Sequence, residues 1–225
     1  MTPLPDPDAP ADRMALSAVV LAAGGAQRLG GRPKCLLERG GEPLVRRQVQ
    51  ALLDCGAGPV VVVTGCHAPS VRAAVQDQPV RVVHHPDWAR GATGSVRMGL
   101  TALAGVPLPV LVALADMPAM GRPELLALQR AWHTRPAHTE VLVPMVHGER
   151  GNPVVLSAAV RDAVLTGNRW PSPRDWQTAH PALVHRWTTD NPAYRQDIDT
   201  PEDLARFNAT QPLPLRWPAG WDQTG

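Results

Sequence analysis

The stretch that decides the fold is Val19–Lys34, which reads Val-Val-Leu-Ala-Ala-Gly-Gly-Ala-Gln-Arg-Leu-Gly-Gly-Arg-Pro-Lys. An apolar run of β-strand type leads directly into a loop that contains four glycines. The loop also contains two basic residues at a defined spacing, Arg28 and Lys34. Glycine lets the backbone adopt positive φ and approach a ligand closely, and free N–H groups and cationic side chains bind phosphate oxygens. The stretch therefore predicts a polyphosphate site with Arg28 and Lys34 as its catalytic cations, although Arg32, Lys34 and Arg39 could instead form a solvated basic turn.

The spacing of this loop excludes the two commonest glycine motifs. A P-loop has a glycine, four further residues and then Gly-Lys-Ser/Thr. Gly25 and Gly30 have this separation, but Gly31 occupies the position of the lysine, and Lys34 is followed by Cys35 rather than by Ser or Thr. The dinucleotide fingerprint G-x-G-x-x-G is absent, because the glycines occur in pairs that are too far apart.

Outside the loop, apolar runs of strand length alternate with segments of helical periodicity. Strands that are apolar throughout, such as 60–63 and 110–114, are typical of a sheet covered by helices on both faces. The pattern predicts an α/β fold, a Rossmann-like three-layer α/β/α arrangement with a mostly parallel sheet. The predicted strands are 18–22, 60–64, 80–84, 110–114, 141–144 and 154–156.

Ligands of such sheets bind at the carboxyl ends of the strands, and each polar motif of this chain begins where an apolar run stops. Gly24 follows the first run, Asp116 follows 110–115, and 150–152 lies in a turn between two later strands. We therefore expect these motifs to meet at one edge of the sheet.

Five segments in this order resemble the MobA-like nucleotidyltransferases, which transfer NMP from an NTP to a phosphorylated acceptor. The resemblance covers most of residues 16–207, and its segments are Leu21–Lys34, Gly91–Arg97 (Gly-Ala-Thr-Gly-Ser-Val-Arg), Leu114–Pro118 (Leu-Ala-Asp-Met-Pro), Arg150–Pro153 (Arg-Gly-Asn-Pro) and Asp197–Leu204 (Asp-Ile-Asp-Thr-Pro-Glu-Asp-Leu). The Ala-Ala-Gly turn and Arg-Pro-Lys are most similar to the MocA branch, the molybdenum cofactor cytidylyltransferases.

The resemblance implies a fold of the nucleotide-diphospho-sugar transferase type and a Mg²⁺-dependent enzyme that uses CTP and molybdopterin. Its products would be molybdopterin cytosine dinucleotide, which a molybdenum hydroxylase could receive, and pyrophosphate. Guanylyl transfer, NMP transfer to another phosphorylated small molecule, and a non-catalytic nucleotide- or cofactor-binding chaperone remain as alternatives.

The resemblance places nucleotide binding in the first turn and in the segment after residue 91. The predicted nucleotide-binding residues are Leu21, Ala22, Ala23, Gly24, Gly25, Thr93, Gly94 and Ser95. The methyl group of Ala23 would narrow the pocket against purines. Ser95 could instead cap a helix over 96–103, and Arg97 could face the acceptor or solvent.

Three carboxylates are the predicted metal ligands. Asp116 follows a buried apolar run, where an acid is costly unless a cation meets it, and Mg²⁺ prefers such hard oxygen ligands. Alternation in Asp197-Ile198-Asp199 puts both acids on one face of an extended segment, with Asp199 favoured and Asp197 as an alternate ligand. Otherwise, Asp116 could cap a helix over 121–132, and Asp199 and Asp203 could serve only the helix that begins after Thr200.

Acceptor binding is assigned to Asn152 and Arg174. Asn152 stands where the family commonly has His, and 166–174 is only loosely similar to the acceptor loop of the family. The histidines show no H-x-x-x-H or H-E-x-x-H spacing, and the neighbours His84 and His85 would point to opposite faces of a strand, so no histidine site is predicted.

Composition bounds the remaining possibilities. The formal net charge of +2 gives no field for bulk nucleic-acid binding, and no apolar window approaches the length of a membrane span. The odd number of cysteines, 3, without C-x-x-C spacing argues against disulfides or zinc and favours a reducing cytoplasm. We expect a disordered tail at 1–14, one nucleotidyltransferase domain at 15–208 and a C-terminal tail at 209–225.

Overall fold

The computed structural model describes residues 15–166 and 169–221. Its centre is an eight-stranded sheet of order β10-β7-β9-β6-β1-β4-β5, with β8 paired to β7. β9 and β8 run antiparallel to their neighbours, and the other pairs are parallel. The strands are β1 (Ser17–Ala22), β4 (Val60–Thr64), β5 (Arg81–His84), β6 (Val110–Leu114), β7 (Val141–Val146), β8 (Glu149–Arg150), β9 (Val154–Leu156) and β10 (Val184–Thr188).

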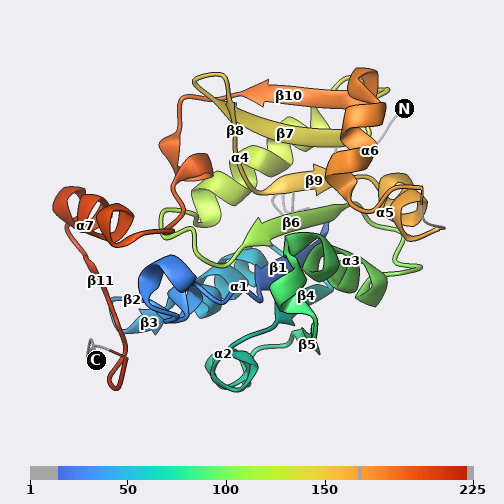
Figure 1. The fold of residues 1–225 in the computed structure, drawn as a ribbon. Coiled ribbons are helices and arrows are strands. Elements are labelled where there is room, and N and C mark those ends of the chain that lie inside the picture. Colours follow the sequence, from blue (N-terminus) through green and yellow to red (C-terminus); the bar gives the residue numbers. More distant parts are fainter. Residues whose placement is uncertain (1–14, 167–168, 222–225) are drawn as a thin grey trace, which may run out of the picture.

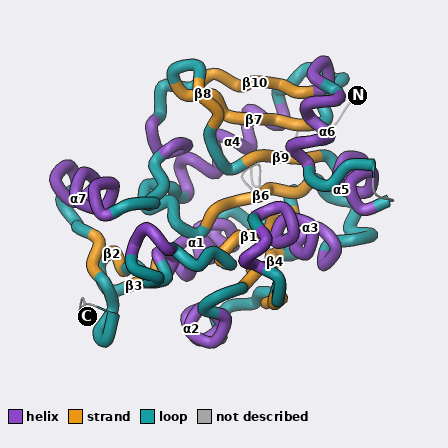
Figure 2. The backbone as a smooth tube through the Cα atoms, in the orientation of Figure 1, coloured by secondary structure: helices purple, strands orange, loops and turns teal. Residues whose placement is uncertain are grey.

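Helices cover both faces of this sheet, as Figures 1 and 2 show. One face carries α1 (Leu44–Asp54), α2 (Ala68–Ala74) and α4 (Arg122–His133), and the other carries α3 (Ala92–Ala102), α5 (Ala158–Leu165) and α6 (Pro173–Ala179). The three-layer α/β/α fold that the sequence predicts is therefore confirmed.

Strand alternation divides the apolar side chains between two cores. Along β1, Ala18 and Val20 pack toward α1 and α4, whereas Val19 packs toward α3. All five residues of β4 are buried, because the strand has helices on both faces and paired strands on both edges. Burial on two sides explains why the central strands are almost entirely apolar.

A smaller layer lies beside the main sheet. It contains the three-stranded sheet β11-β2-β3, built from β2 (Glu38–Arg39), β3 (Glu42–Pro43) and β11 (Leu215–Arg216), and the helix α7 (Pro201–Thr210) (Figure 1). Phe207 and Leu215 pack with Leu29 and Ile198 in a third core cluster. This layer holds the segment before α7 against the glycine loop.

All six predicted strands are present within two residues of their predicted bounds, whereas β8, β10 and the small sheet are not predicted. The predicted tail at 1–14 lies outside the described residues, and part of the predicted tail at 209–225 forms β11. None of the helices in the described ranges has the length and hydropathy needed to cross a membrane.

Candidate functional site

The glycine loop leaves β1 and turns back over the end of the sheet. Ala26, Gly30 and Gly31 have positive φ values of 46°, 67° and 73°. A Cβ atom at Gly25 would lie 2.7 Å from the Trp88 ring, whereas one at Gly24 would meet nothing within 4 Å. Gly25 is therefore required for packing, and Gly24 keeps space open above the loop.

The end of β6 and the segment before α7 bring three carboxylates together, Asp116, Asp197 and Asp199. One potential ligand atom from each lies within 4.8 Å of the others. The backbone N–H of Ile198 donates to the Asp116 carbonyl at 3.1 Å, and the Ile198 side chain is buried in the third core cluster. Because Ile198 points into the core, both flanking aspartates point toward Asp116. We call these three residues the carboxylate triad.

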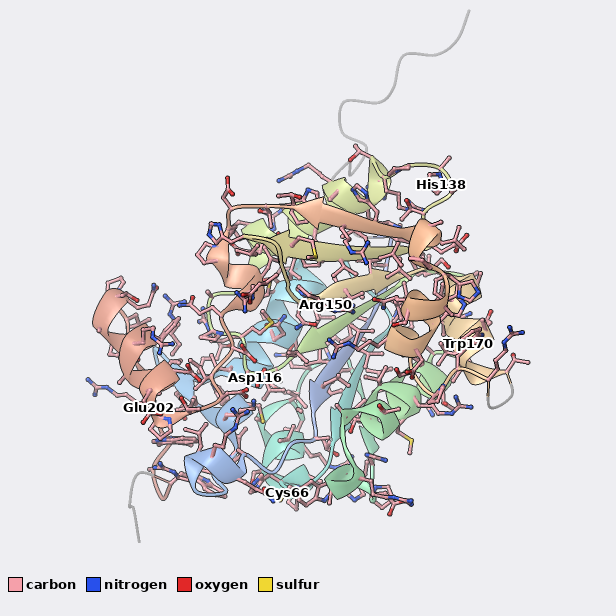
Figure 3. The ribbon with its side chains drawn as sticks, turned by 45° about the horizontal axis from the view of Figure 1, so that its top comes forward. Cys66, Asp116, His138, Arg150, Trp170 and Glu202 are labelled. Carbon is pink, nitrogen blue, oxygen red and sulfur yellow. The ribbon has the colours of Figure 1, made fainter. Side chains whose placement is uncertain are left out.

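The cations of the glycine loop contact this triad. Lys34 Nζ forms ion pairs with Asp116 and, at 2.5 Å, with Asp199, and Arg28 Nη2 lies 2.6 Å from the other Asp199 oxygen. Figure 3 shows Asp116 near the centre of the view, away from the peripheral Glu202. Arg28 and Lys34 thus meet residues that lie 171 and 165 positions away along the chain.

The close charges shift the pKa values within this cluster. Burial tends to raise the pKa of Asp199, but hydrogen bonds and charge from Lys34 and Arg28 outweigh burial and lower it. Burial tends to lower the pKa of Lys34, and Asp116 and Asp199 reverse this and raise it. Burial, followed by the charges of Asp116 and Asp199, raises the pKa of Asp197. Asp197 is therefore the carboxylate least compensated by the chain's own cations.

A cavity of about 730 Å³ joins the loop, the cations and the triad, and we call it the first cavity. Of the predicted nucleotide-binding residues, Leu21, Ala23, Gly24, Gly25 and Ser95 line it. Ala22 packs in the core instead, and Thr93 lines an adjoining cavity. Arg28, Lys34 and all three predicted metal ligands also line the first cavity.

The turn before α3 differs from its prediction. The helix begins at Ala92, with Gly91 at its N-cap, so Ser95 lies inside the helix and does not cap it. The Ser95 hydroxyl lies 3.2 Å from His85 Nδ1, and a Cβ atom at Gly94 would lie 2.6 Å from the His85 ring. The buried His85 thus positions this turn. Sequence reasoning missed it, although its place directly after a strand could have drawn attention to it.

The structure also decides among the helix-cap alternatives. Gly121 is the N-cap of α4, and its N–H donates to Glu124 Oε2 at 3.1 Å, so Asp116 does not cap that helix. Thr200 and Asp203 form the capping box of α7, whereas the Asp199 carboxylate contacts Arg28 and Lys34.

The basic turn is not a solvated charge run as a whole. The Arg32 guanidinium lies 4.4 Å from the centroid of the Trp217 ring and donates to the Trp221 carbonyl, while His67 packs edge-on against Trp221. Lys34 is largely buried against the triad. The segment after β11 therefore packs against the glycine loop.

Beyond Leu21 and Leu114 lies a second cavity of about 450 Å³, which contains both predicted acceptor residues, Asn152 and Arg174. Arg150, which lies near the centre of Figure 3, also lines it and donates to Gln177 Oε1 at 2.7 Å. Arg97 is half-buried and does not line the second cavity, because its guanidinium donates to the Val164 and Leu165 carbonyls at the end of α5.

Comparisons with known proteins relate this geometry to a family. Residues 18–183 match the MobA-like NTP transferase domain. The chain is 33% identical over 203 residues to nicotine blue oxidoreductase of Paenarthrobacter nicotinovorans, which covers 87% of this chain and 98% of that protein. It is 33% identical over 159 residues to the bifunctional protein GlmU of Anaeromyxobacter sp. (strain K), covering 68% of this chain but only 32% of GlmU.

Among solved structures, the chain resembles a nucleotidyl transferase from Methanothermobacter thermautotroptrophicus. The two superpose with a TM-score of 0.68 at 27% sequence identity, covering 85% of this chain and 95% of the other. The main sheet and both helical layers therefore correspond to those of a nucleotidyl transferase.

Proposed function

The chain belongs to the MobA-like NTP transferase family, and from this premise we propose that it transfers CMP from CTP to the phosphate of molybdopterin in a Mg²⁺-dependent reaction. The products are molybdopterin cytosine dinucleotide and pyrophosphate. The assignment to nucleotidyl transfer follows from the family, and the choice of nucleotide, acceptor and metal is our proposal. We assign the activity to a domain at 15–208.

The observation that carries the proposal is the meeting of Arg28, Lys34 and the carboxylate triad in the first cavity. Nucleotidyl transfer must bring two anionic reactants together and release a third anion. Positioned cations are therefore the main requirement for catalysis.

The triad fits a magnesium ion by the chemistry of its donors. Three carboxylate groups place hard oxygen atoms within 4.8 Å of one another, and the Lys34 ammonium already serves as a cation between Asp116 and Asp199. Asp116 and Asp199 would hold the ion, with Asp197 as the alternate ligand. When bound, the ion would neutralise charge on the triphosphate oxygens.

The reaction needs no protein nucleophile. An oxygen of the acceptor phosphate, already ionised at neutral pH, attacks the α-phosphorus of CTP; the new O–P bond forms as the bond from the α-phosphorus to the bridging oxygen breaks. Pyrophosphate leaves with that electron pair. Arg28 grips β- and γ-phosphate oxygens through its guanidinium, and Lys34 neutralises charge at the α-phosphate and on the leaving group.

Cytosine selection rests on the first turn and the turn before α3. The Ala23 methyl group lines the first cavity and leaves less room for a purine than glycine would. His85 fixes the start of α3 through Ser95.

Asn152 and Arg174 bind the acceptor in the second cavity. We place the enzyme in the cytoplasm, where a molybdenum hydroxylase would receive its product.

The relative named an oxidoreductase provides the competing function. Hydride transfer from a dinucleotide would give the carboxylate triad no role, and the chain lacks the G-x-G-x-x-G fingerprint. Guanylyl transfer and a non-catalytic chaperone compete within the same fold.

The test is pyrophosphate release from each of the four NTPs with Mg²⁺, with and without molybdopterin, alongside NADH and NADPH oxidation. We expect release only with CTP and molybdopterin together. Release with GTP instead would replace the nucleotide assignment. Oxidation of either reduced dinucleotide without pyrophosphate release would show that the chain is an oxidoreductase instead. If neither activity is found, the non-catalytic chaperone function is favoured.

A further inference from the structure

Three hollows form one continuous trough on the α3, α5 and α6 side of the sheet. Leu21, Ala92 and Leu114 line both the first and the second cavity. Arg150, Arg174 and Gln177 line both the second cavity and a third hollow of about 210 Å³. The trough thus leads from the carboxylate triad to a group of arginines, over a floor that includes Val112, Leu114, Val154 and Leu156.

Three arginines surround the far end of this trough, Arg150, Arg174 and Arg186, and we call them the arginine trio. They come from β8, α6 and β10, three elements that meet only in the folded chain. Within residues 15–166 and 169–221, no ion pair joins any of the three to a carboxylate. Three like charges around one hollow are unfavourable unless an anion joins them.

The acidic groups next to the trio are engaged elsewhere. Asp175 accepts hydrogen bonds from the Ser172 N–H at 2.9 Å and its hydroxyl at 2.7 Å, which caps α6. Glu149 pairs with Arg195. Burial, followed by the charges of Arg174 and Arg186, lowers the pKa of Arg150. The positive charge of the trio is therefore not neutralised by the chain itself.

The far end is also held in place by a buried polar side chain. Gln177 is 6% exposed, and its Oε1 accepts from Arg150 Nη1 at 2.7 Å. Gln177 and Arg174 lie on the same short helix, whose start is fixed by the capping box of Ser172 and Asp175. Arg150 is therefore held in place before any ligand binds, and the backbone that carries Arg174 is fixed by the helix cap.

The strand order separates the trio from the reaction centre. Asp116 follows β6, and Arg186 lies on β10, three strands away in the order β6-β9-β7-β10. With neighbouring strands about 4.8 Å apart, this separation is roughly 14 Å. Arg186 pairs in register with Val143 of β7, and Val112 of the floor pairs with Val154 of β9. A phosphate bound at the trio is too far from the triad to react there.

We propose that the acceptor is an elongated molecule with anionic groups at both ends, whose reacting phosphate lies at the carboxylate triad and whose second oxyanion group binds the arginine trio. An apolar or planar body spans the floor between them. The proposal rests on nucleotidyl transfer in the first cavity and concerns the acceptor alone. A phosphate that carries a distal oxyanion would take the place of molybdopterin, whose pterin end carries no oxyanion. Arg174 then binds the distal group and not the reacting phosphate.

The test uses two rigid probes of suitable length, biphenyl-4,4′-diyl bisphosphate and biphenyl-4-yl phosphate, which differ by one terminal anion. Dissociation constants are measured by calorimetry on the full chain with Mg²⁺ and α,β-methylene CTP, an analogue that blocks transfer. A third probe with a carboxylate at the distal end distinguishes a carboxylate from a phosphate as the second group. Binding of the CTP analogue is measured separately in the same samples.

We expect the bisphosphate to bind at least about tenfold more tightly than the monophosphate, since each charge-assisted bidentate contact adds to affinity. Arg174→Gln and Arg186→Gln, tested separately, should each remove most of this preference. With Arg186→Gln, whose residue lines only the third hollow, affinity for the monophosphate should stay within about twofold. The control Arg72→Gln makes the same charge change on α2, on the other face of the sheet, and should retain the preference.

Equal affinities of the two probes for the unmodified chain, with binding of the CTP analogue intact, would overturn the distal site. A preference that Arg72→Gln removes as fully as Arg186→Gln would also overturn it, because the effect would then reflect net charge. Failure to bind the CTP analogue is a separate result, which would count against nucleotidyl transfer itself.

Discussion

The two ends of the trough differ in whether their basic side chains are paired with carboxylates. At the nucleotide end, Arg28 and Lys34 are both paired with aspartates. At the far end, the arginine trio surrounds a hollow without an acidic partner among the described residues. The balanced end suits a ligand that brings its own cation, such as a magnesium nucleotide, whereas the unbalanced end suits a bare anion.

The largest expected effect is a loss of turnover when one carboxylate is removed from the triad at the nucleotide end. Asp116→Asn removes one carboxylate charge and keeps the size of the side chain, so turnover should fall by about a thousandfold, the scale seen when one electrostatic group is lost from an active site. Pyrophosphate release measures this effect, and thermal unfolding shows whether the fold survives. Asp190→Asn, a matched change at an exposed aspartate, should keep full activity. Full activity of Asp116→Asn would remove Asp116 from the metal site.

Two glycine substitutions compare a position with free space around its backbone, Gly24, with one whose backbone is closely packed, Gly151. A methyl group at Gly24 would meet nothing within 4 Å, whereas one at Gly151 would lie 2.5 Å from the Tyr194 carbonyl oxygen, which already accepts from the Asn152 N–H. Gly151→Ala should lower the free energy of unfolding by about 1–3 kcal/mol. Gly24→Ala should leave it nearly unchanged and weaken CTP binding about tenfold by narrowing the approach to the loop. The reverse assignment of the two effects would contradict the structure of both turns.

The sign of a stability change distinguishes paired from unpaired cations. At neutral pH, Lys34→Gln leaves Asp116 and Asp199 without their shared cation and should cost about 2 kcal/mol of unfolding free energy in the metal-free protein. Because the folded pKa of Lys34 is raised, its contribution is present below pH 10.5 and is lost only as the pH rises through that raised value. Arg186→Gln relieves repulsion and should stabilise by about 0.2–1 kcal/mol.

Denaturant titrations at low and high salt measure both changes. Added salt should shrink the gain from Arg186→Gln more than the loss from Lys34→Gln, because exposed charges are screened more strongly than buried ones. Destabilisation by Arg186→Gln would indicate that the trio has a partner within the chain.

The smallest expected effect concerns His67, which packs against Trp221 beside the glycine loop. Burial lowers the pKa of His67 despite its hydrogen bond to the Gly31 backbone. A histidine with a lowered folded pKa binds protons more tightly when unfolded, so its protonation below pH 6.5 destabilises the fold. Between pH 7.5 and 5.5, the unmodified chain should lose slightly more stability than His67→Gln, by less than about 1.4 kcal/mol. Parallel pH dependences in denaturant unfolding would contradict this.

Much of the fold is predictable because the apolar runs are long and buried on both faces. The strands 60–64 and 110–114 illustrate this. By contrast, β10 is half-exposed at the sheet edge, and β8, β2 and β3 have two residues each, which is too short for a periodic signal.

The candidate site divides in the same way. Arg28, Lys34, Asp116 and Asp199 follow strands or flank a helix start, so strand-end logic places them at one edge, and the structure brings them together. Their catalytic and metal-binding roles stay predictions. His85 is missed because the histidines are tested only for the spacing of metal sites, whereas His85 positions the turn before α3 through Ser95.

Convergence of the trio was also beyond sequence reasoning. Of the three, the sequence indicates only Arg174 as an acceptor-binding residue. The position of Arg150 depends on the pairing of β8 with Met145, and the position of Arg186 depends on the register of β10. Ser95 was misplaced as an alternative cap because α3 begins at Ala92, before the range expected.

The distance along the chain between Arg28 and Asp199, 171 residues, has a consequence for synthesis. A ribosome delivers the glycine loop early, and the last two carboxylates of the triad emerge only after every strand of the main sheet has been translated. A nascent chain that has already folded β1, β4 and β6 therefore has only Asp116 of the three carboxylates, so the proposed binding of a metal nucleotide would be acquired near the end of translation rather than gradually.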